Sequence, residues 1–133
     1  MQRRLLVALA VFGLACDDTP TSPTDPDPTL VTETFSSIVQ TKGATSRSFT
    51  TTDTGPISVS LTSLSKDGAA VGLALGLADG ADGQCAPTFF VVTTVYSGRQ
   101  LSTTADPGRY CFVVYDVGEL TGQTNFTVTV VHP

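Results

Sequence analysis

The most reactive side chains in this sequence of 133 residues are three cysteines, Cys16, Cys85 and Cys111, and one histidine, His132. A catalytic thiol needs a base beside it, and His132, next to the last residue, is the only histidine that could serve. A structural zinc ion takes four ligands, which two thiols and a distant histidine do not supply. The sequence also lacks the Gly-x-Ser-x-Gly motif of many serine hydrolases. We therefore expect neither a thiol or serine enzyme nor a zinc site.

Acidic residues suggest two further kinds of chemistry. Asp116 and Glu119 could form the carboxylate pair of a glycosidase, but they flank a Val-Gly pair, which favours a polar turn. Asp67, Asp79 and Asp82 are weak calcium candidates, because the last two share one tight loop and calcium binds clustered oxygen ligands. That loop lacks the spacing of an EF-hand, and Asp and Gly are common turn residues. We therefore expect no metal and no cofactor.

Residues 1–15 have the features of a secretory signal peptide. Arg3 and Arg4 precede an apolar run of ten residues, too short to span a membrane as a helix, for which about 20 are needed. The following Leu-Ala-Cys16 resembles the lipobox of bacterial lipoproteins, although Gly13 stands where that motif usually has Leu, Val or Ile. The resemblance implies cleavage before Cys16, diacylglycerol on its thiol, and acylation of the new amino group with a fatty acid such as palmitate. An ordinary signal peptide that is cut nearby is the alternative.

Lipidation would fix both the location of the protein and the state of its other cysteines. A lipoprotein is exported and held on a membrane of the bacterial cell envelope by its acyl chains. Disulfides persist in such oxidising compartments. Once Cys16 is lipidated, Cys85 and Cys111 remain as a pair, and an even pair in an exported domain predicts a disulfide. Two free thiols are the alternative.

Residues 16–31 are expected to comprise the lipidated cysteine and a disordered linker. Positions 17–29 contain only Asp, Thr, Pro and Ser, so the segment has nothing to bury that would offset the entropic cost of ordering it. The whole chain has a net charge of -5 with only 7 Lys and Arg, which are scattered. These residues form no phosphate-binding face, so we expect no nucleic-acid partner.

Residues 32–133 are predicted to form one all-β domain, a single antiparallel β-sandwich of about eight strands. Ile57, Val59 and Leu61 alternate with polar residues, which is typical of a half-buried strand. The segment Val71–Leu77 alternates large residues with Gly and Ala, so one face is bulky and the other nearly bare. Further strands are expected at Phe89–Tyr96, Tyr110–Tyr115, Asn125–Val131, Thr32–Val39, Ser46–Thr51 and Gln100–Thr104. The absence of Trp favours a jelly roll over an immunoglobulin-like sandwich.

The order of these strands, with the turn Pro107-Gly108-Arg109-Tyr110, resembles the bacterial pre-peptidase C-terminal (PPC) domains. Those domains are secreted β-sandwich modules that are usually appended to peptidases. The similarity covers roughly residues 33–132, and in this sequence no catalytic domain precedes the module. The resemblance implies a non-catalytic module.

The strand Tyr110–Tyr115 is apolar on both faces. We expect Phe112 and its neighbours two residues away to point into the core, which places Cys111, Val113 and Tyr115 outside. Val113 and Tyr115 are therefore candidates for a small recognition surface. The alternative is that the loop carrying Cys85 covers this face.

Two functions fit these features. The first is a membrane-tethered, non-catalytic lipoprotein of the cell envelope, with a β-sandwich for interaction or structural support. The second is a module that binds a glycan or a peptide, with calcium as a possible aid. In both cases we expect a monomer that binds a protein or a glycan, and no enzyme.

Overall fold

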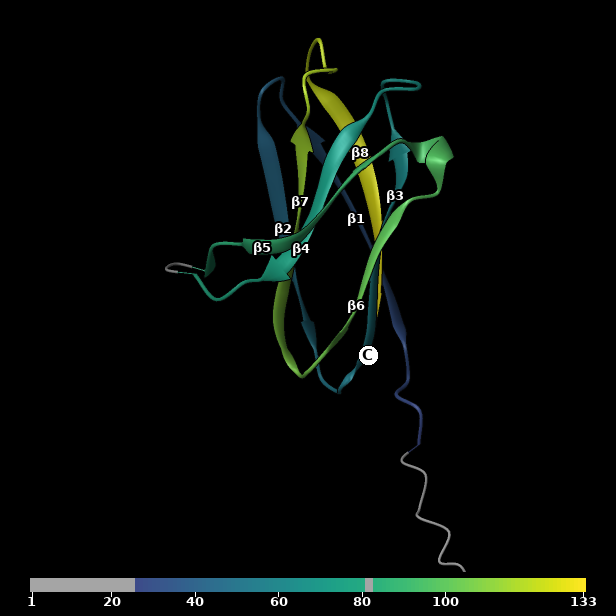
Figure 1. Ribbon diagram of the computed structural model, residues 1–133, viewed down its shortest axis with the longest axis vertical. Helices are drawn as coiled ribbons and strands as arrows, with labels where there is room; N and C mark the ends of the chain where they lie inside the picture. The colour runs from purple at the N-terminus through teal and green to yellow at the C-terminus, as the bar shows by residue number, and fades with distance from the viewer. Residues whose placement is uncertain (1–25, 81–82) are drawn as a thin grey trace, which may run out of the picture.

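The computed structural model describes residues 26–80 and 83–133, which form two four-stranded sheets (Figure 1). The strands are β1 (Val31–Val39), β2 (Ala44–Thr51), β3 (Gly55–Leu64), β4 (Val71–Leu77), β5 (Ala86–Thr93), β6 (Gln100–Ala105), β7 (Gly108–Asp116) and β8 (Thr124–His132), and a 3-10 turn, η2 (Val95–Ser97), follows β5. Within the described residues, no helix has the length and apolar character needed to cross a membrane. The predicted all-β sandwich of eight strands is confirmed.

The strands follow the order of a jelly roll. One sheet has the order β1-β8-β3-β6 and the other β2-β7-β4-β5, and the neighbouring strands in both sheets are antiparallel. The first half of the chain therefore pairs with the second half in reverse order: β1 with β8, β2 with β7, β3 with β6 and β4 with β5. All connections except β4 to β5 pass from one sheet to the other. This arrangement leaves β5 and β6 as neighbouring edge strands on one side of the sandwich, and β1 and β2 on the other.

One predicted strand was placed wrongly at both ends. The sequence predicts a strand over Phe89–Tyr96, whereas β5 covers Ala86–Thr93. The strand ends because Thr94 and Ser97 form a reciprocal capping box around η2, and Gly98 then adopts a left-handed conformation with φ 62°. Tyr96 consequently leaves the sheet and, at 75%, is the most exposed large hydrophobic side chain among the described residues.

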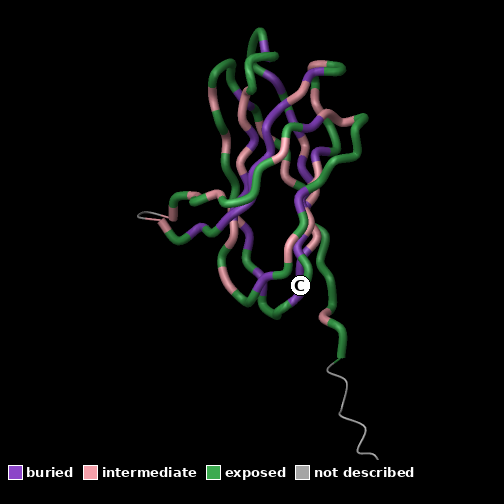
Figure 2. The backbone as a smooth tube through the Cα atoms, viewed as in Figure 1, coloured by how far each residue is buried: buried purple, intermediate pink, exposed green. Residues whose placement is uncertain are grey.

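The core lies between the two sheets, where the alternating apolar residues of both meet (Figure 2). Its largest fully buried side chains include Phe112, Phe126, Ile57 and Leu73. The ring of Phe112 meets the ring of Phe35 edge-on, with centroids 5.3 Å apart. The expected inward orientation of Phe112 and Val114 is confirmed.

The β1–β2 side of the sandwich is closed by polar bonds between the two edge strands. Arg47 on β2 donates through Nη2 to the Ser37 hydroxyl on β1, at 2.7 Å. Thr45 on β2 donates to the backbone carbonyl of Ile38, at 2.6 Å. Both Arg47 and Ser37 lie opposite core residues of the neighbouring strands, so their side chains point between the sheets. An inward-pointing charge on an edge strand discourages the pairing of a further strand.

The described N-terminal segment and Pro133 lie at the same end of the sandwich (Figure 1). Here Gly55 leaves room for two prolines, since a Cβ on it would lie 2.9 Å from Pro28 Cγ and 2.7 Å from Pro133 Cγ. Strand β1 starts at Val31, one residue before the expected start of the domain. Cys16 and positions 17–25 of the predicted linker lie outside the described residues.

Candidate functional site: an apolar face beside β5

The two cysteines of the domain form the predicted disulfide. Cys85 lies before β5 and Cys111 lies within β7, and their Cα atoms are 5.7 Å apart across 26 positions of sequence. Cys111 points to the outer face of its sheet but is only 2% exposed. The disulfide therefore holds the segment before β5 against the outside of the β2-β7-β4-β5 sheet.

Small residues on β4 leave room on this outer face for the backbone of β5 and for a tyrosine ring of β7. A Cβ on Gly76 would lie 2.1 Å from the carbonyl oxygen of Ala86, so the backbone at the start of β5 passes directly beside it. A Cβ on Gly72 would lie 2.0–2.4 Å from atoms of the Tyr115 ring. The nearly bare face that the sequence predicts for β4 is therefore filled by neighbouring strands.

The predicted surface residues Val113 and Tyr115 do lie on this outer face, and both are half-buried. Tyr115 rests over Gly72, so part of its ring is already covered. The structure thus supports a mixture of the two readings of this strand, because Cys111 is covered while Val113 and Tyr115 remain partly open.

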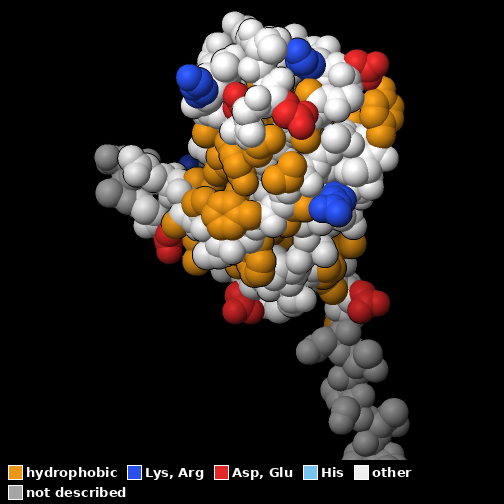
Figure 3. Space-filling view, turned by 45° about the horizontal axis from the view of Figure 1, so that its top comes forward, with side chains coloured by type: hydrophobic (Ala, Val, Ile, Leu, Met, Phe, Trp, Pro, Cys, Tyr) orange, Lys and Arg blue, Asp and Glu red, His pale blue; other side chains and the backbone are white. Residues whose placement is uncertain are grey.

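Two residues that the sequence did not single out are more exposed on the same face. Phe90 lies opposite Ala74 and Val92 lies opposite Gly72, so both share the outer face with Val113 and Tyr115. Phe90 is 59% exposed and Val92 49%. Hydrophobic side chains gather on the side of the molecule that carries β4 and β5 (Figure 3). We call Phe90, Val92, Val113 and Tyr115 the outer apolar face.

A groove opens beside this face, between β5 and β6. It has a volume of about 290 Å³, and the exposed side chains of Leu77 and Phe89 line it together with Thr103 and Tyr110. The Tyr110 hydroxyl donates to the backbone carbonyl of Asp106, at 2.8 Å. The groove therefore combines an aromatic ring with hydroxyl groups.

The carboxylates of Asp116 and Glu119 hold turns together. Asp116 accepts hydrogen bonds from the amides of Lys42, Gly118, Glu119 and Leu120, at 2.8–3.1 Å. The Lys42 amide above all lowers the pKa of Asp116 from its ordinary value; desolvation, the next largest effect, opposes it, and the amides of Leu120, Gly118 and Glu119 lower the pKa further. Glu119 accepts from the amide of Ala70, at 2.6 Å. This geometry agrees with the polar turn that the sequence favours.

Asp116→Asn should make the domain less sensitive to acid. Because the pKa of Asp116 is lowered by folding, its ionised form stabilises the native state above about pH 4, and this contribution is lost as the pH falls through the folded-state pKa. We expect the variant to melt below the native protein at pH 7, and the difference to shrink as the pH falls through the folded-state pKa of Asp116. Thermal melts from pH 7 to pH 2 measure this. Asp53→Asn is the control, since that carboxylate accepts from the neighbouring Thr52 hydroxyl. Parallel pH curves for native protein and Asp116→Asn would contradict the prediction.

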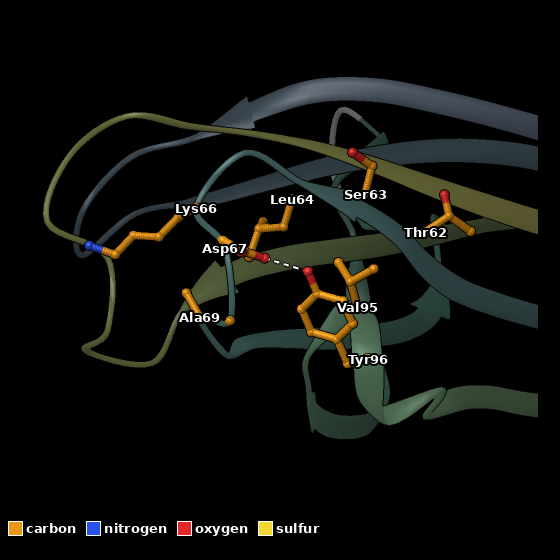
Figure 4. A pocket seen from close by; sticks show the side chains of 9 residues that line it. Thr62, Ser63, Leu64, Lys66, Asp67, Ala69, Val95 and Tyr96 are labelled. Carbon is orange, nitrogen blue, oxygen red and sulfur yellow. Dashed lines mark hydrogen bonds between the residues drawn. The ribbon is translucent and has the colours of Figure 1, made fainter.

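The calcium candidates are not brought together. Asp67 precedes β4 and Asp79 follows it, so they lie at opposite ends of that strand. The Asp67 carboxylate accepts a hydrogen bond from the Tyr96 hydroxyl, at 2.5 Å, above a small pocket at the β3–β4 turn (Figure 4). This bond and the charge of Asp67 raise the pKa of Tyr96. Asp82 lies outside the described residues, among which no group of three metal-ligating side chains occurs.

His132 is buried at the end of the sandwich where Pro133 lies. Its Nε2 lies 2.7 Å from Glu33 Oε1, and its Nδ1 lies 2.8 Å from the backbone oxygen of Pro133. The ring packs against Phe49, with centroids 5.2 Å apart. Both ring nitrogens therefore have partners within the domain, and the histidine contributes to the attachment of β1.

In comparisons with known proteins, no protein-family model matches this chain and no curated protein resembles it.

Proposed function

We propose that this chain is a non-catalytic lipoprotein of the bacterial cell envelope, tethered to a membrane through Cys16, with a PPC-like β-sandwich that serves as an interaction module. The observation that carries the proposal is the outer apolar face, where Phe90 and Val92 are about half exposed beside Val113 and Tyr115. Contiguous exposed apolar side chains on a small domain are typical of an interaction site.

The hydrogen bonds that the polar side chains make within the domain support a binding role over a catalytic one. The carboxylates of Asp116 and Glu119 accept backbone amides at turns, and His132 is buried against Glu33. Each of these groups stabilises the fold where an enzyme would need it free to meet a substrate. The disulfide adds support for export, since such bonds persist in oxidising compartments.

The position of the described N-terminal segment indicates which end of the domain would face the proposed membrane anchor. The chain enters β1 at the end where Pro133 lies, and the β1–β2, β3–β4 and β7–β8 loops lie at the opposite end (Figure 1). A tether would therefore hold these loops away from the membrane, and the outer apolar face would lie along the side of the upright sandwich.

Replacing Cys16 with Ser tests the anchor. In the proposed lipoprotein the acyl chains on Cys16 hold the protein on the membrane. We expect the native protein in the membrane fraction with the added mass of its acyl groups, and the Cys16→Ser variant in the soluble fraction. A native protein without acyl mass, or a variant that has lost residues 1–15 and still stays on the membrane, would refute the lipoprotein proposal.

A photoreactive residue at position 90 tests the interaction module. In cells of the native host, we expect a cross-linked adduct from position 90 and none from position 34, because Thr34 lies on the outer face of β1 in the other sheet. Replacing Val113 with Lys should reduce the adduct by about tenfold or more, since a charge in an apolar contact costs affinity. Equal adducts from both positions would show that the outer apolar face is not the binding site.

A second candidate function is the binding of a glycan or a peptide, and the groove between β5 and β6 favours it. Phe89 offers an aromatic ring beside the hydroxyls of Thr103 and Tyr110, a combination that suits sugars and peptide side chains. A thermal-shift panel with oligosaccharides and peptides, each with and without calcium, tests it. A ligand that binds only the folded state raises the melting temperature. A shift that is lost in Phe89→Ala would support the groove, and a shift retained in that variant would place the ligand elsewhere.

A further inference from the structure

The edge strand β5 has a residue pattern that is typical of a strand with neighbours on both sides. Its central residues, Phe89 to Val92, form a continuous apolar run, as do strands that are buried on both faces. Yet β5 ends the order β2-β7-β4-β5 and pairs only with β4 among the described strands. Such an edge presents unpaired backbone N–H and C=O groups to solvent.

The other three edge strands carry charged or polar side chains where β5 exposes apolar ones. On β1 and β2, the charged residues Glu33 and Arg47 point between the sheets and bind His132 and Ser37. On β6, the residues exposed to solvent are polar: Gln100, Ser102 and Thr104. Strand β5 contains no charged residue, and its exposed side chains include Phe89, Phe90 and Val92.

The exposed apolar side chains of β5 point to both faces of the sheet. Phe89 lies opposite Leu75 of the core and borders the groove, together with Leu77. Phe90 and Val92 lie on the outer apolar face. A ligand that lay on one face would cover only one of these sets. A strand added at the edge would cover both, because its own side chains also alternate between the two faces.

We infer that β5 pairs antiparallel with β5 of a second copy of this chain. Such a dimer has two-fold symmetry, so each copy supplies the same surface, and β5 itself is the apolar strand that the edge requires. Pairing would join the two β2-β7-β4-β5 sheets into one continuous sheet. Centred on Val91, it would set Phe90 of one copy opposite Val92 of the other on the outer face, and Phe89 opposite Thr93 on the groove side. The inference deepens the proposed function, because it names the partner of the β5 part of the outer apolar face, Phe90 and Val92, and it replaces the expected monomer by a weak dimer.

The apolar area that β5 can bury sets the affinity of the proposed dimer. Pro87 has no N–H, and the register of β5 against β4 shifts between Leu75 and Gly76, so the edge suited to pairing is the short stretch Phe89–Thr93. Leu77, Phe89, Phe90 and Val92 are between 43% and 59% exposed. This corresponds to an apolar side-chain area on the order of 300 Å² per chain, well below the roughly 800 Å² per partner of a standard specific interface, so the contact is a weak and transient one. We therefore expect a dissociation constant of roughly 10 µM to 1 mM.

Sedimentation velocity of residues 16–133 carrying Cys16→Ser, which lack the apolar run of the signal peptide, tests the inference without interference from lipid micelles. As the protein concentration rises from about 5 µM to 1 mM, we expect the chain with an unsubstituted β5 to shift from monomer to dimer. Val92→Lys should weaken the dimer by at least about tenfold, since it places two like charges together at the symmetric contact. Ile38→Lys is the matched control, because Ile38 is also an exposed β-branched residue on an edge strand, β1 of the other sheet. Thermal melts of both variants check that they are folded.

Amide hydrogen exchange on the unsubstituted edge gives a second readout that needs no variant at β5. Amides in Phe89–Thr93 should exchange more slowly as concentration rises, whereas those of β6 should not change. A chain that stays monomeric up to about 1 mM overturns the inference. So does a dimer that Val92→Lys and Ile38→Lys weaken equally, or one that protects no amide in β5. A monomer that still cross-links an envelope protein through position 90 would overturn self-pairing and leave the proposed function standing.

Discussion

Replacing Cys85 and Cys111 together with Ala is expected to lower the free energy of unfolding by about 3.5 kcal/mol, within a usual range of about 2–5. The disulfide closes a loop across 26 positions and thereby restricts the unfolded chain. It also holds the segment before β5 against the sheet, next to the point where the Ala86 carbonyl passes Gly76. Ala is the better replacement, because Cys111 is buried and a serine hydroxyl would need a partner there.

Urea unfolding with and without a reducing agent measures this difference. The reducing agent should destabilise the native domain by about the same amount and leave the double variant unchanged, which makes that variant its own control. We expect the reduced domain to keep its fold, because the strand pairing and the core between the sheets do not depend on the disulfide. If reduction left the midpoint of the native domain unchanged, the disulfide would contribute nothing to stability.

Strand periodicity in the sequence was sufficient to predict the two layers. The alternation of Ile57, Val59 and Leu61 with polar residues fixes which face of β3 is buried, because a slip of one residue would expose all three. The absence of Trp favoured the jelly roll, and the observed strand order agrees with it. The end of β5 was missed because Thr94 and Ser97 stop the strand through local hydrogen bonds that a run of β-branched residues does not reveal.

The most exposed part of the candidate site could not be predicted from periodicity. Phe89–Val92 is apolar at every position, so alternation does not tell which residues face outward. That assignment comes from the register with β4, where Phe90 lies opposite Ala74 and Val92 opposite Gly72. One signal was present in the sequence: the Gly and Ala residues of β4 indicated a face that neighbouring side chains must fill. The identity of those side chains, Tyr115 above all, follows only from tertiary contacts.

Strand β7 is apolar on both faces as well, and two of its adjacent residues give the sharpest test of the register. Phe112→Ala is expected to lower the free energy of unfolding by about 3–5 kcal/mol, because it empties a fully buried site. The loss includes the edge-on contact with Phe35. Since domains of this size are stable by only about 5–15 kcal/mol, a large share of the total would be lost.

Val113→Ala provides the matched control on the same strand. Its side chain points to the outer apolar face and is half-buried, so we expect a loss of about 1 kcal/mol or less. Urea unfolding of both variants measures the difference, and circular dichroism at low denaturant shows whether Phe112→Ala still folds. If that variant unfolds completely, Phe112→Leu keeps most of the volume and should show a smaller loss of the same sign. Equal losses for Phe112→Ala and Val113→Ala would mean that β7 does not bury one face and expose the other, and the outer apolar face would then lose two of its four residues.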